Sequence, residues 1–561
     1  MITFPPHNTQ KSPKVPNIST PTITPELIKY QQSTTTPPFE MPSTRILLKL
    51  NSNQSISAPY LLPQTINPRA QVLSCAKSKF RVKVTRIFLP GGEELLTPQA
   101  VQDVIDLSHE RRTVGPTFLV SAGEPYVGAL APPSPARAEN SACEVHVLAE
   151  DSYIDPQAIA QLEAAAKLPG MVRAVGLPDL HPGGKFPIGA AFVSERYIYP
   201  SLVGSDIGCG MTLFLTGLTR KRLEDQNGIK RVAESLRGLE TAWRSPQERA
   251  AWLGDCAAGD EWDKLVGTIG GGNHFAEFQI VEHVEEGNGL CSGIVVLLIH
   301  SGSRRFGKHI LETFTKDDKS ISLAYGDPKT AEYLKLHTQA CNWASKSRDL
   351  IALRIFECIE GSRWALPETI DLDTTSHLKT RLQGRRVLDI LHNSVTPTLW
   401  PPHAEAQYQK PMFIHRKGAA PAPQGAPFLP LPGSRGTPTL LIKPLFSEIN
   451  QNGFKNGLSL AHGAGRMLSR NEARGLSRKY NNDVKVLTEM KPMGMRNGGK
   501  GRVVTSGYVV CDEKELVWEE AVEAYKDVEV VAQDLRKRGA ARVIGKCIPK
   551  VTYKVRNESL L

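Results

Sequence analysis

The chain has 561 residues, of which 40% are hydrophobic and 22% are charged, values that are ordinary for a globular protein and allow a sizeable core. No run approaches the ~20 apolar residues that span a bilayer, which excludes a transmembrane protein and makes a membrane partner unexpected. Nine scattered cysteines form no C-x-x-C pair, so the sequence indicates neither a zinc ribbon nor a disulfide framework. The net charge of +11 favours a polyanionic partner, although this signal is weak alone.

Residues 1–75 are predicted to be a disordered leader, since they are rich in Ser, Thr and Pro and hold too little apolar surface to offset ordering entropy. Through residue 39, Glu26 is the sole carboxylate, and the first arginine is Arg45. A secretory pattern is absent, which favours a cytoplasmic or nuclear location. The shortage of acid residues keeps a mitochondrial location open, but the prolines argue against an amphipathic transit helix. Met41 is an alternative start, so the place of residues 1–40 in the mature protein stays open.

After the leader, the pattern predicts alternating helices and strands. Val295–Ile299 is an apolar run typical of a buried strand, which would deliver His300 at its end. We predict an α+β fold with one large catalytic domain over residues 76–555 and a C-terminal tail over 556–561. The local predictions are a strand at Phe80–Ile87, helices at 98–107, 155–167 and 328–358, and a Pro/Ala loop at Ala131–Ala136.

Six residues able to bind metals or act as nucleophiles stand beside small or amide residues, where the backbone can approach a ligand closely. They are Asp206 and Cys209 in S-D-I-G-C-G, His274 in G-N-H-F, His300 in H-S-G-S-R, His392 in L-H-N and His462 in H-G-A-G-R. Each has an ordinary alternative, such as a turn carboxylate, a buried structural cysteine, a loop histidine or, for His392, an apolar helix face. The joint occurrence of O, S and N donors favours a metalloenzyme instead.

In this order, these motifs resemble those of the RtcB-type RNA ligases. The resemblance includes L-P-D-L-H-P-G-G around His181, R-K-G at Arg416, P-G-S at Pro432 and the late A-Y-K-D element at Ala524, and it covers roughly residues 145–555. Residues 88–144 match the family poorly. The resemblance implies an RtcB-like domain in which mixed β-sheets, flanked by helices, surround a deep metal-containing cleft.

The family joins RNA ends with a 2′,3′-cyclic phosphate or 3′-phosphate to a 5′-hydroxyl, in tRNA splicing or RNA repair, using GTP and Mn²⁺. By resemblance, Cys209 would bridge two Mn²⁺ ions, Asp206 and His274 would complete one site, and His300 and His392 would complete the other. A thiolate has the lone pairs to bridge two cations, and two ions can clamp a transferring phosphoryl group.

His462 would be the nucleophile that forms a histidine–GMP intermediate, since a neutral imidazole nitrogen attacks phosphorus without first losing a proton. The resemblance places the guanylate against Asn273, Glu277, Pro432, Gly433, Ser434, His462, Gly463, Ala464, Gly465 and Lys554. We also expect four phosphate clamps: Arg304, Arg416, Lys417 and Arg466.

Two alternative functions stay open. If the chain holds two metal ions but does not ligate RNA, it would be an RNA cyclic phosphodiesterase or phosphatase. If it is catalytically silent, it would only bind RNA. The expected partners are RNA, such as tRNA halves or broken ends, GTP, and an archease-like activator whose necessity the sequence leaves open. The physiological RNA, the preference for GTP over ATP and the oligomeric state are equally open.

Overall fold

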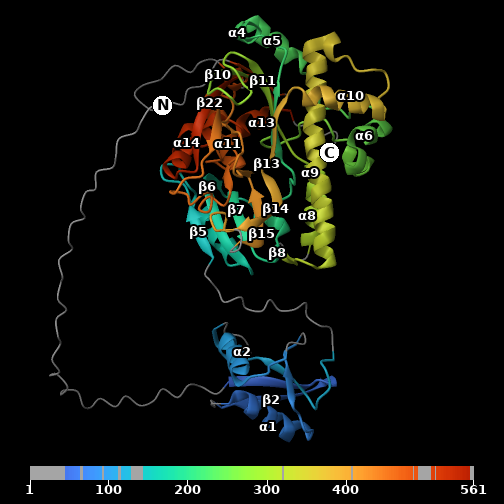
Figure 1. The fold of residues 1–561 in the computed structure, drawn as a ribbon, viewed down its shortest axis with the longest axis vertical. Helices are drawn as coiled ribbons and strands as arrows, with labels where there is room; N and C mark the ends of the chain where they lie inside the picture. The colour runs from blue at the N-terminus through green and yellow to red at the C-terminus, as the bar shows by residue number, and fades with distance from the viewer. Residues whose placement is uncertain are drawn as a thin grey trace, which may run out of the picture. The chain divides into compact units, whose positions relative to one another are not determined.

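The computed structural model describes residues 44–63, 67–90, 94–110, 115–127, 143–316, 318, 321–405, 409–483, 485–490, 507–511 and 513–555. The chain divides into two compact units, Met1–Ala136 and Arg137–Leu561 (Figure 1). Residues 1–43 of the predicted leader, the Ala131–Ala136 loop and the 556–561 tail lie outside the described residues. No helix in the described ranges is long and apolar enough to cross a membrane.

The N-terminal unit contains a four-stranded sheet covered by two helices, α1 (Pro68–Phe80) and α2 (Pro98–Glu110). Helix α1 begins at Pro68 because the Asn67 side chain accepts the Ala70 N–H, and a proline suits the first helical position. Strand β1 pairs in parallel with β4 and antiparallel with β2. In spatial order the strands are β2 (Asn53–Leu62), β1 (Thr44–Leu50), β4 (Thr117–Ser121) and β3 (Arg86–Phe88).

This unit corrects the predicted boundaries. Within the leader predicted for residues 1–75, the structure forms β1, β2 and most of α1, because Ile46 and Leu48, two residues apart on one face of β1, pack into a core with Phe118 and Val120. The single domain predicted for 76–555 is also wrong at its start, since residues 76–127 belong to this separate core. The strand predicted at Phe80–Ile87 shortens to β3, because α1 continues to Phe80.

The larger unit is built on two sheets whose strands are mostly antiparallel. The larger sheet has the order β13 (Arg386–Leu391), β9 (Gly210–Leu215), β11 (Val295–Ser301), β10 (Phe275–Val284), β22 (Ala541–Tyr553), β18 (Thr439–Pro444) and β17 (Leu429–Pro432). In addition, β21 (Gly507–Val510) pairs with β22, and β20 (Glu489–Met490) pairs with β21. The second sheet has the order β14 (Asn393–Trp400), β15 (Lys410–Lys417), β7 (Ile188–Ser194), β6 (Met171–His181) and β5 (Glu144–Val147). Two-stranded pairs are β8 (Tyr197–Ile198) with β12 (Leu323–Ala324) and β16 (Ala419–Pro421) with β19 (Ser459–Ala461).

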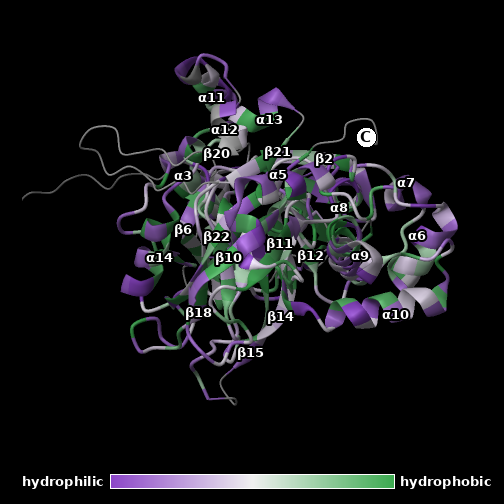
Figure 2. Cartoon of the chain, turned by 90° about the horizontal axis from the view of Figure 1, so that it is seen from above, coloured by the Kyte–Doolittle hydropathy of each residue, from purple (hydrophilic) through white to green (hydrophobic). Residues whose placement is uncertain are grey.

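Helices cover these sheets and confirm the mixed α+β prediction. The longest, α9 (Pro328–Glu360), packs against β9 and β11, and α6 and α10 lie beyond it (Figure 1). Hydropathy follows this layering, because the inner strands are largely apolar and the outer helices carry polar faces (Figure 2). The other helices are α3 (Pro156–Ala166), α4 (Arg220–Glu224), α5 (Gln226–Ser235), α6 (Pro246–Leu253), α7 (Asp260–Asp263), α8 (Arg305–Thr315), α10 (Leu372–Gln383), α11 (Arg470–Arg474), α12 (Lys485–Thr488), α13 (Lys514–Glu519) and α14 (Val528–Lys537).

The helices predicted at 98–107, 155–167 and 328–358 are confirmed as α2, α3 and α9, and the strand at Val295–Ile299 is confirmed as β11. Helix α3 begins where the Asp155 side chain accepts the Gln157 N–H.

Candidate active site

Strand register brings the predicted metal ligands together at one edge of the larger sheet. The adjacent strands β13, β9, β11 and β10 run alternately up and down, so two of them end where the other two begin. Gly210 of β9 pairs with Leu391 of β13 and with Ser301 of β11, and Phe275 of β10 pairs with His300. The residues at or next to these pairs are Cys209, His274, His300 and His392.

The donor atoms form two groups that share the thiol of Cys209. Its Sγ lies 3.4 Å from His274 Nε2 and 3.3 Å from His300 Nε2. His300 Nε2 lies 3.1 Å from His392 Nε2, and His274 Nε2 lies 2.8 Å from Asp206 Oδ2. Within each group, Cys209–His300–His392 and Asp206–Cys209–His274, the ligand atoms lie within 4.8 Å of one another. All five predicted ligands therefore meet in one place.

The loop before β9 holds Cys209 against the end of β13. The Cys209 carbonyl accepts the backbone N–H of His392 at 2.8 Å. Gly208 has φ of +73°, and a Cβ there would lie 2.7 Å from Cys341 Cα on α9, so this position requires glycine. His392 itself lies in a bend between β13 and β14, so the apolar helix face considered as its ordinary alternative is not formed.

A buried arginine supports this loop from α9. Arg348 donates from Nη1 to the carbonyl oxygens of Gly208, at 3.0 Å, and Ser301, at 2.9 Å. Its Nη2 donates to Asp389 Oδ1 at 2.7 Å. One side chain therefore fixes the residues that adjoin Cys209 and His300.

Burial sets the protonation of the ligand cluster. It lowers the pKa of His300 and His392 well below the ordinary value, so both imidazoles are neutral and able to bind a cation. Burial also raises the pKa of the Cys209 thiol well above its usual value, and a nearby cation would oppose that shift. His392 Nδ1 is buried and has no hydrogen-bond partner among the described residues. The donor set fits one or two divalent ions of the Mn²⁺ or Zn²⁺ kind.

His462 follows β19 and lies between the ligand cluster and a cavity. Its ring centroid is 4.7 Å from that of His392 and 6.4 Å from that of His300. His462 Nδ1 lies 2.8 Å from Oδ2 of Asp179, a fully buried carboxylate on β6. Asp179 is not among the residues predicted from the sequence, although it stands two residues before His181 in the L-P-D-L-H motif.

The adjoining cavity has a volume of about 180 Å³, and all ten predicted guanylate-binding residues line it. Eleven further residues, not predicted to bind the guanylate, complete the walls. These are His181, Ile188, Met211, Phe275, His300, Arg435, Arg466, Arg470, Glu520, Tyr525 and Thr552.

Several polar groups in the cavity wall are suited to a ligand. Ser434 Oγ is buried and has no hydrogen-bond partner in the described part of the chain. Burial raises the pKa of Glu277 to about 7, even though Thr552 and Gln279 donate to its carboxylate. Lys554 Nζ donates to the carbonyl oxygens of Gly272 and His274, and burial lowers its pKa to about 8.

The four expected phosphate clamps bond instead to protein acceptors, so the structure does not support that role for them. Arg304 donates to Thr268 and Leu265, and Lys417 donates to the carbonyl oxygens of Phe186 and Ser201. Arg416 donates to the hydroxyls of Ser459 and Thr396 and to the Leu458 carbonyl, and Arg466 to Leu468, Glu519, Glu520 and Tyr525.

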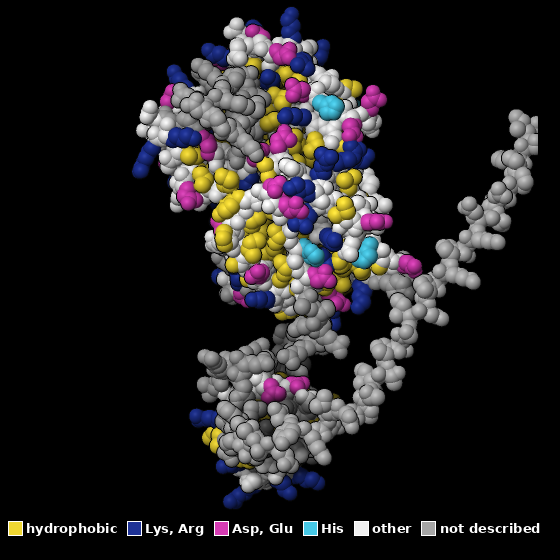
Figure 3. Space-filling view, turned by 90° about the vertical axis from the view of Figure 1, so that its left-hand side faces the viewer, with side chains coloured by type: hydrophobic (Ala, Val, Ile, Leu, Met, Phe, Trp, Pro, Cys, Tyr) yellow, Lys and Arg dark blue, Asp and Glu magenta, His cyan; other side chains and the backbone are white. Residues whose placement is uncertain are grey.

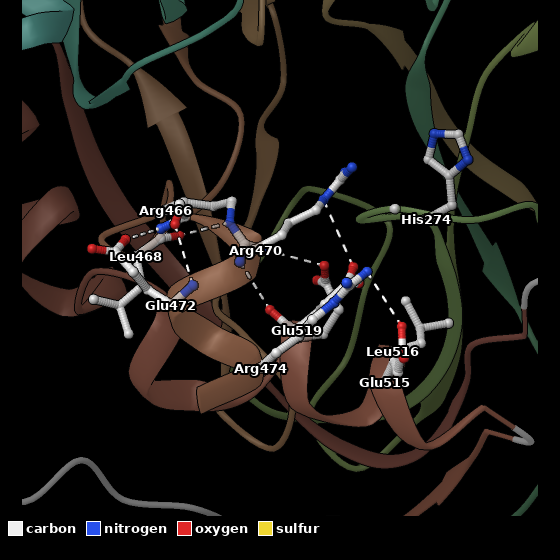
Figure 4. Close-up of polar contacts among 12 residues, drawn as sticks. His274, Arg466, Leu468, Arg470, Glu472, Arg474, Glu515, Leu516 and Glu519 are labelled. Carbon is white, nitrogen blue, oxygen red and sulfur yellow. Dashed lines mark hydrogen bonds and ion pairs between the residues drawn. The ribbon is translucent and has the colours of Figure 1, made fainter. Parts of the chain in front are cut away.

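Arg470 differs from these four. Its side chain is 56% exposed, lines the cavity and extends from α11 toward the loop that carries His274 (Figure 4). Its nearest carboxylate is Glu519, with Nε 3.9 Å from Oε2. Among the cavity-lining cations, Arg470 is the one with a largely exposed side chain.

Comparison with known proteins agrees with this geometry. A family model described as tRNA-splicing ligase RtcB matches residues 161–251 and 247–555. The RNA-splicing ligase RtcB2 of Escherichia coli is 34% identical over 414 residues, which are 73% of this chain and 94% of that protein. The tRNA-splicing ligase RtcB of Aeropyrum pernix is 28% identical over 484 residues, covering 72% of this chain and 93% of that protein. The RNA-splicing ligase RtcB homolog 1 of Entamoeba dispar is 26% identical over 477 residues, covering 71% and 82% respectively.

Proposed function

Because this chain belongs to the RtcB family of RNA ligases, we propose that it seals RNA ends that carry a 2′,3′-cyclic phosphate or 3′-phosphate to ends that carry a 5′-hydroxyl. In this proposal the reaction consumes GTP, requires Mn²⁺ and proceeds through a histidine–GMP intermediate, in tRNA splicing or RNA repair. The observation that carries the proposal is the position of His462, next to the metal-ligand cluster on one side and the predicted guanylate cavity on the other.

The metal-ligand cluster would hold two Mn²⁺ ions, with the thiolate of Cys209 contributing to both sites. Asp206 and His274 would complete the first site, and His300 and His392 the second. The two donor groups that share Cys209 and the burial of Cys209 and the three histidines support this assignment. When bound, the ions would neutralise phosphate charge during transfer.

His462 would attack through Nε2. Asp179 accepts the hydrogen of Nδ1, which leaves the lone pair on Nε2 and fixes the ring. The Nε2–phosphorus bond would form at the α-phosphate as the bond to the bridging oxygen breaks and pyrophosphate leaves. The RNA 3′-phosphate would then displace His462 from the guanylate, and the 5′-hydroxyl would displace GMP.

The cavity would hold the guanylate. Glu277 and Lys554 offer a hydrogen-bond acceptor and a donor for the edge of a base, and the free hydroxyl of Ser434 offers another. The small residues Gly463, Ala464 and Gly465 leave space beside His462. A metal-dependent phosphodiesterase would use none of these groups, so the cavity favours nucleotidyl transfer over hydrolysis alone.

A labelling experiment tests this proposal. Wild-type protein incubated with α-labelled GTP and Mn²⁺ should form an acid-labile covalent adduct, and His462→Ala should form none. His309→Ala is the matched control, because His309 stacks on Trp262 outside the cavity and its loss should leave labelling intact. Absence of an adduct on the wild type, or its persistence on His462→Ala, would contradict the proposal. Labelling by ATP in preference to GTP would contradict the guanine contacts.

A further inference from the structure

The N-terminal unit has an uneven charge distribution that the ligase site does not explain. Residues 44–92 contain eight basic residues and no aspartate or glutamate. Four of the eight stand within seven residues at the end of α1 and just after it: Lys77, Lys79, Arg81 and Lys83. All four are exposed. We call these four residues the basic segment.

The geometry at the end of α1 keeps these cations apart from carboxylates. Lys77 and Lys79 lie in the last turn of the helix, and Arg81 ends it in the left-handed region with φ of +55°. Lys83 follows between α1 and β3, outside regular secondary structure. Within the described residues, no ion pair links any of the four to an acid, whereas Arg86 nearby pairs with Glu94 at 2.7 Å. The basic segment is therefore an accessible concentration of positive charge.

The described carboxylates of the unit have other positions and partners. Glu94 binds Arg86, and Glu124 accepts the backbone N–H of Ala122. Asp103 and Asp106 accept from glutamines on their own helix, α2. In Figure 3, both signs of charge mix on the face of the larger unit, and a few basic and acidic side chains of the N-terminal unit are also visible. These four carboxylates therefore bond to residues outside the basic segment.

The basic segment also lies outside the part of the chain that carries the ligase chemistry. The family match begins at residue 161, and the cavity and ligand cluster belong entirely to the larger unit. A positive surface on a separate core, joined covalently to a site for RNA ends, is suited to binding the phosphates of the same RNA, since a tether raises the local concentration of the bound ligand.

We propose that the basic segment, Lys77, Lys79, Arg81 and Lys83, is an RNA-binding surface that contacts the phosphate backbone and holds the substrate to the chain during sealing. This inference rests on the proposed function, because RNA is the polyanion that the ligase site would use. Binding there would be independent of sequence and sensitive to salt, because backbone contacts release counterions and read no bases.

The test uses the full-length protein with Lys77→Gln, Lys79→Gln, Arg81→Asn and Lys83→Gln combined, asparagine being tolerated at positive φ. The probe is a fluorescent single-stranded RNA of about 20 nucleotides, long enough to cover a backbone groove. The matched control neutralises four exposed lysines of the larger unit that alternate with carboxylates: Lys308, Lys316, Lys329 and Lys335. We expect the first variant to bind RNA at least tenfold more weakly at low salt. Its slope of log affinity against log salt should be shallower by about 2 to 3, as expected for four lost phosphate contacts.

The control variant should bind RNA like the wild type, and both variants should still form the GTP adduct. That adduct separates the two proposals, because its absence from the wild type contradicts the ligase mechanism and not the binding surface. Equal loss of RNA affinity in both variants, or none in either, would overturn the basic segment as an RNA site. Polyglutamate serves as a competitor in a further measurement. If it displaces RNA from the basic segment at an equal concentration of charges, the surface would suit an acidic protein, and that result would also overturn the proposal.

Discussion

His462 Nδ1 lies 2.8 Å from Asp179 Oδ2, and the same carboxylate oxygen accepts the backbone N–H of His462 at 3.2 Å. Two contacts from one buried carboxylate fix both the position of the imidazole and its tautomer. Gly465, with φ of +72°, makes this approach possible, because a Cβ there would lie 2.3 Å from the Asp179 carbonyl oxygen. Asp179 would therefore act as a positioning residue for the proposed nucleophile.

Replacing Asp179 by Asn should slow formation of the GTP adduct by roughly 100-fold or more, since an amide can donate to Nδ1 and favour the wrong tautomer. The affinity for GTP should change only a few-fold, because Asp179 does not line the cavity. Single-turnover labelling at saturating GTP measures the first quantity, and equilibrium binding of GTP measures the second.

Asp534→Asn is the matched control. Asp534 is equally buried, accepts the backbone N–H groups of Asp151 and Ser152, and does not line the cavity. Its replacement should reduce the free energy of unfolding and leave the labelling rate unchanged. An Asp179→Asn protein that labels at the wild-type rate would show that His462 is oriented by other groups.

Cys209→Ala should remove the donor that both ligand groups share. We expect the affinity for Mn²⁺ to fall by roughly 100-fold or more, together with loss of the GTP adduct. Bound manganese per chain after equilibrium dialysis is the direct measurement. Cys256→Ala, at a buried cysteine outside both ligand groups, should retain its metal. Full manganese content without the thiol of Cys209 would refute the shared-ligand assignment.

Residue types and their neighbours predicted most of the candidate site. Most of the proposed metal ligands stand at or beside a strand end and next to a small or amide residue, and that local signal is present in the sequence, as for His300 after Val295–Ile299. The mixed α+β class and the long helices were predictable for the same reason, because periodicity is a local property.

Features that depend on distant partners were not predictable. His392 follows an apolar segment that suits a helix, and only its pairing with β9 makes that segment strand β13. Arg416 and Arg466 look like phosphate clamps in the sequence, yet their acceptors come from residues up to 59 positions away. Asp179 is 283 residues from His462, so nothing local connects the two.

The carboxylate of Glu277 in the cavity wall predicts that the affinity for GTP depends on pH. Burial raises the pKa of Glu277 to about 7, above the ordinary value of 4.5, so the group gains a proton as the pH falls through 7. If the ionised form accepts hydrogen bonds from guanine, GTP should bind about eightfold more weakly at pH 6.0 than at pH 7.5. Glu277→Gln should bind weakly at both values and lose this dependence. If the affinity of the wild type for GTP does not change between pH 6.0 and pH 7.5, Glu277 does not take part in recognition of the base.

Arg348 offers a test of how the fold supports the metal ligands. Its guanidinium is fully buried and binds Asp389 together with the carbonyl oxygens of Gly208 and Ser301. Arg348→Met should lower the free energy of unfolding by about 3 kcal/mol, because it leaves the Asp389 carboxylate, whose side chain is only 19% exposed, without its cation. Denaturant titration of the apoprotein measures this loss.

The double variant Arg348→Met/Asp389→Leu separates stability from metal binding. Removing both charges should restore much of the lost stability, since neither remains unpaired. The two carbonyl contacts stay broken, however, so the loops that carry Cys209 and His300 would lose their common anchor. We therefore expect the affinity for Mn²⁺ to stay roughly 10- to 100-fold below that of the wild type in both variants. If the double variant recovers wild-type metal affinity together with stability, Arg348 supports the fold alone, and the ligand geometry is set by the strand register without it.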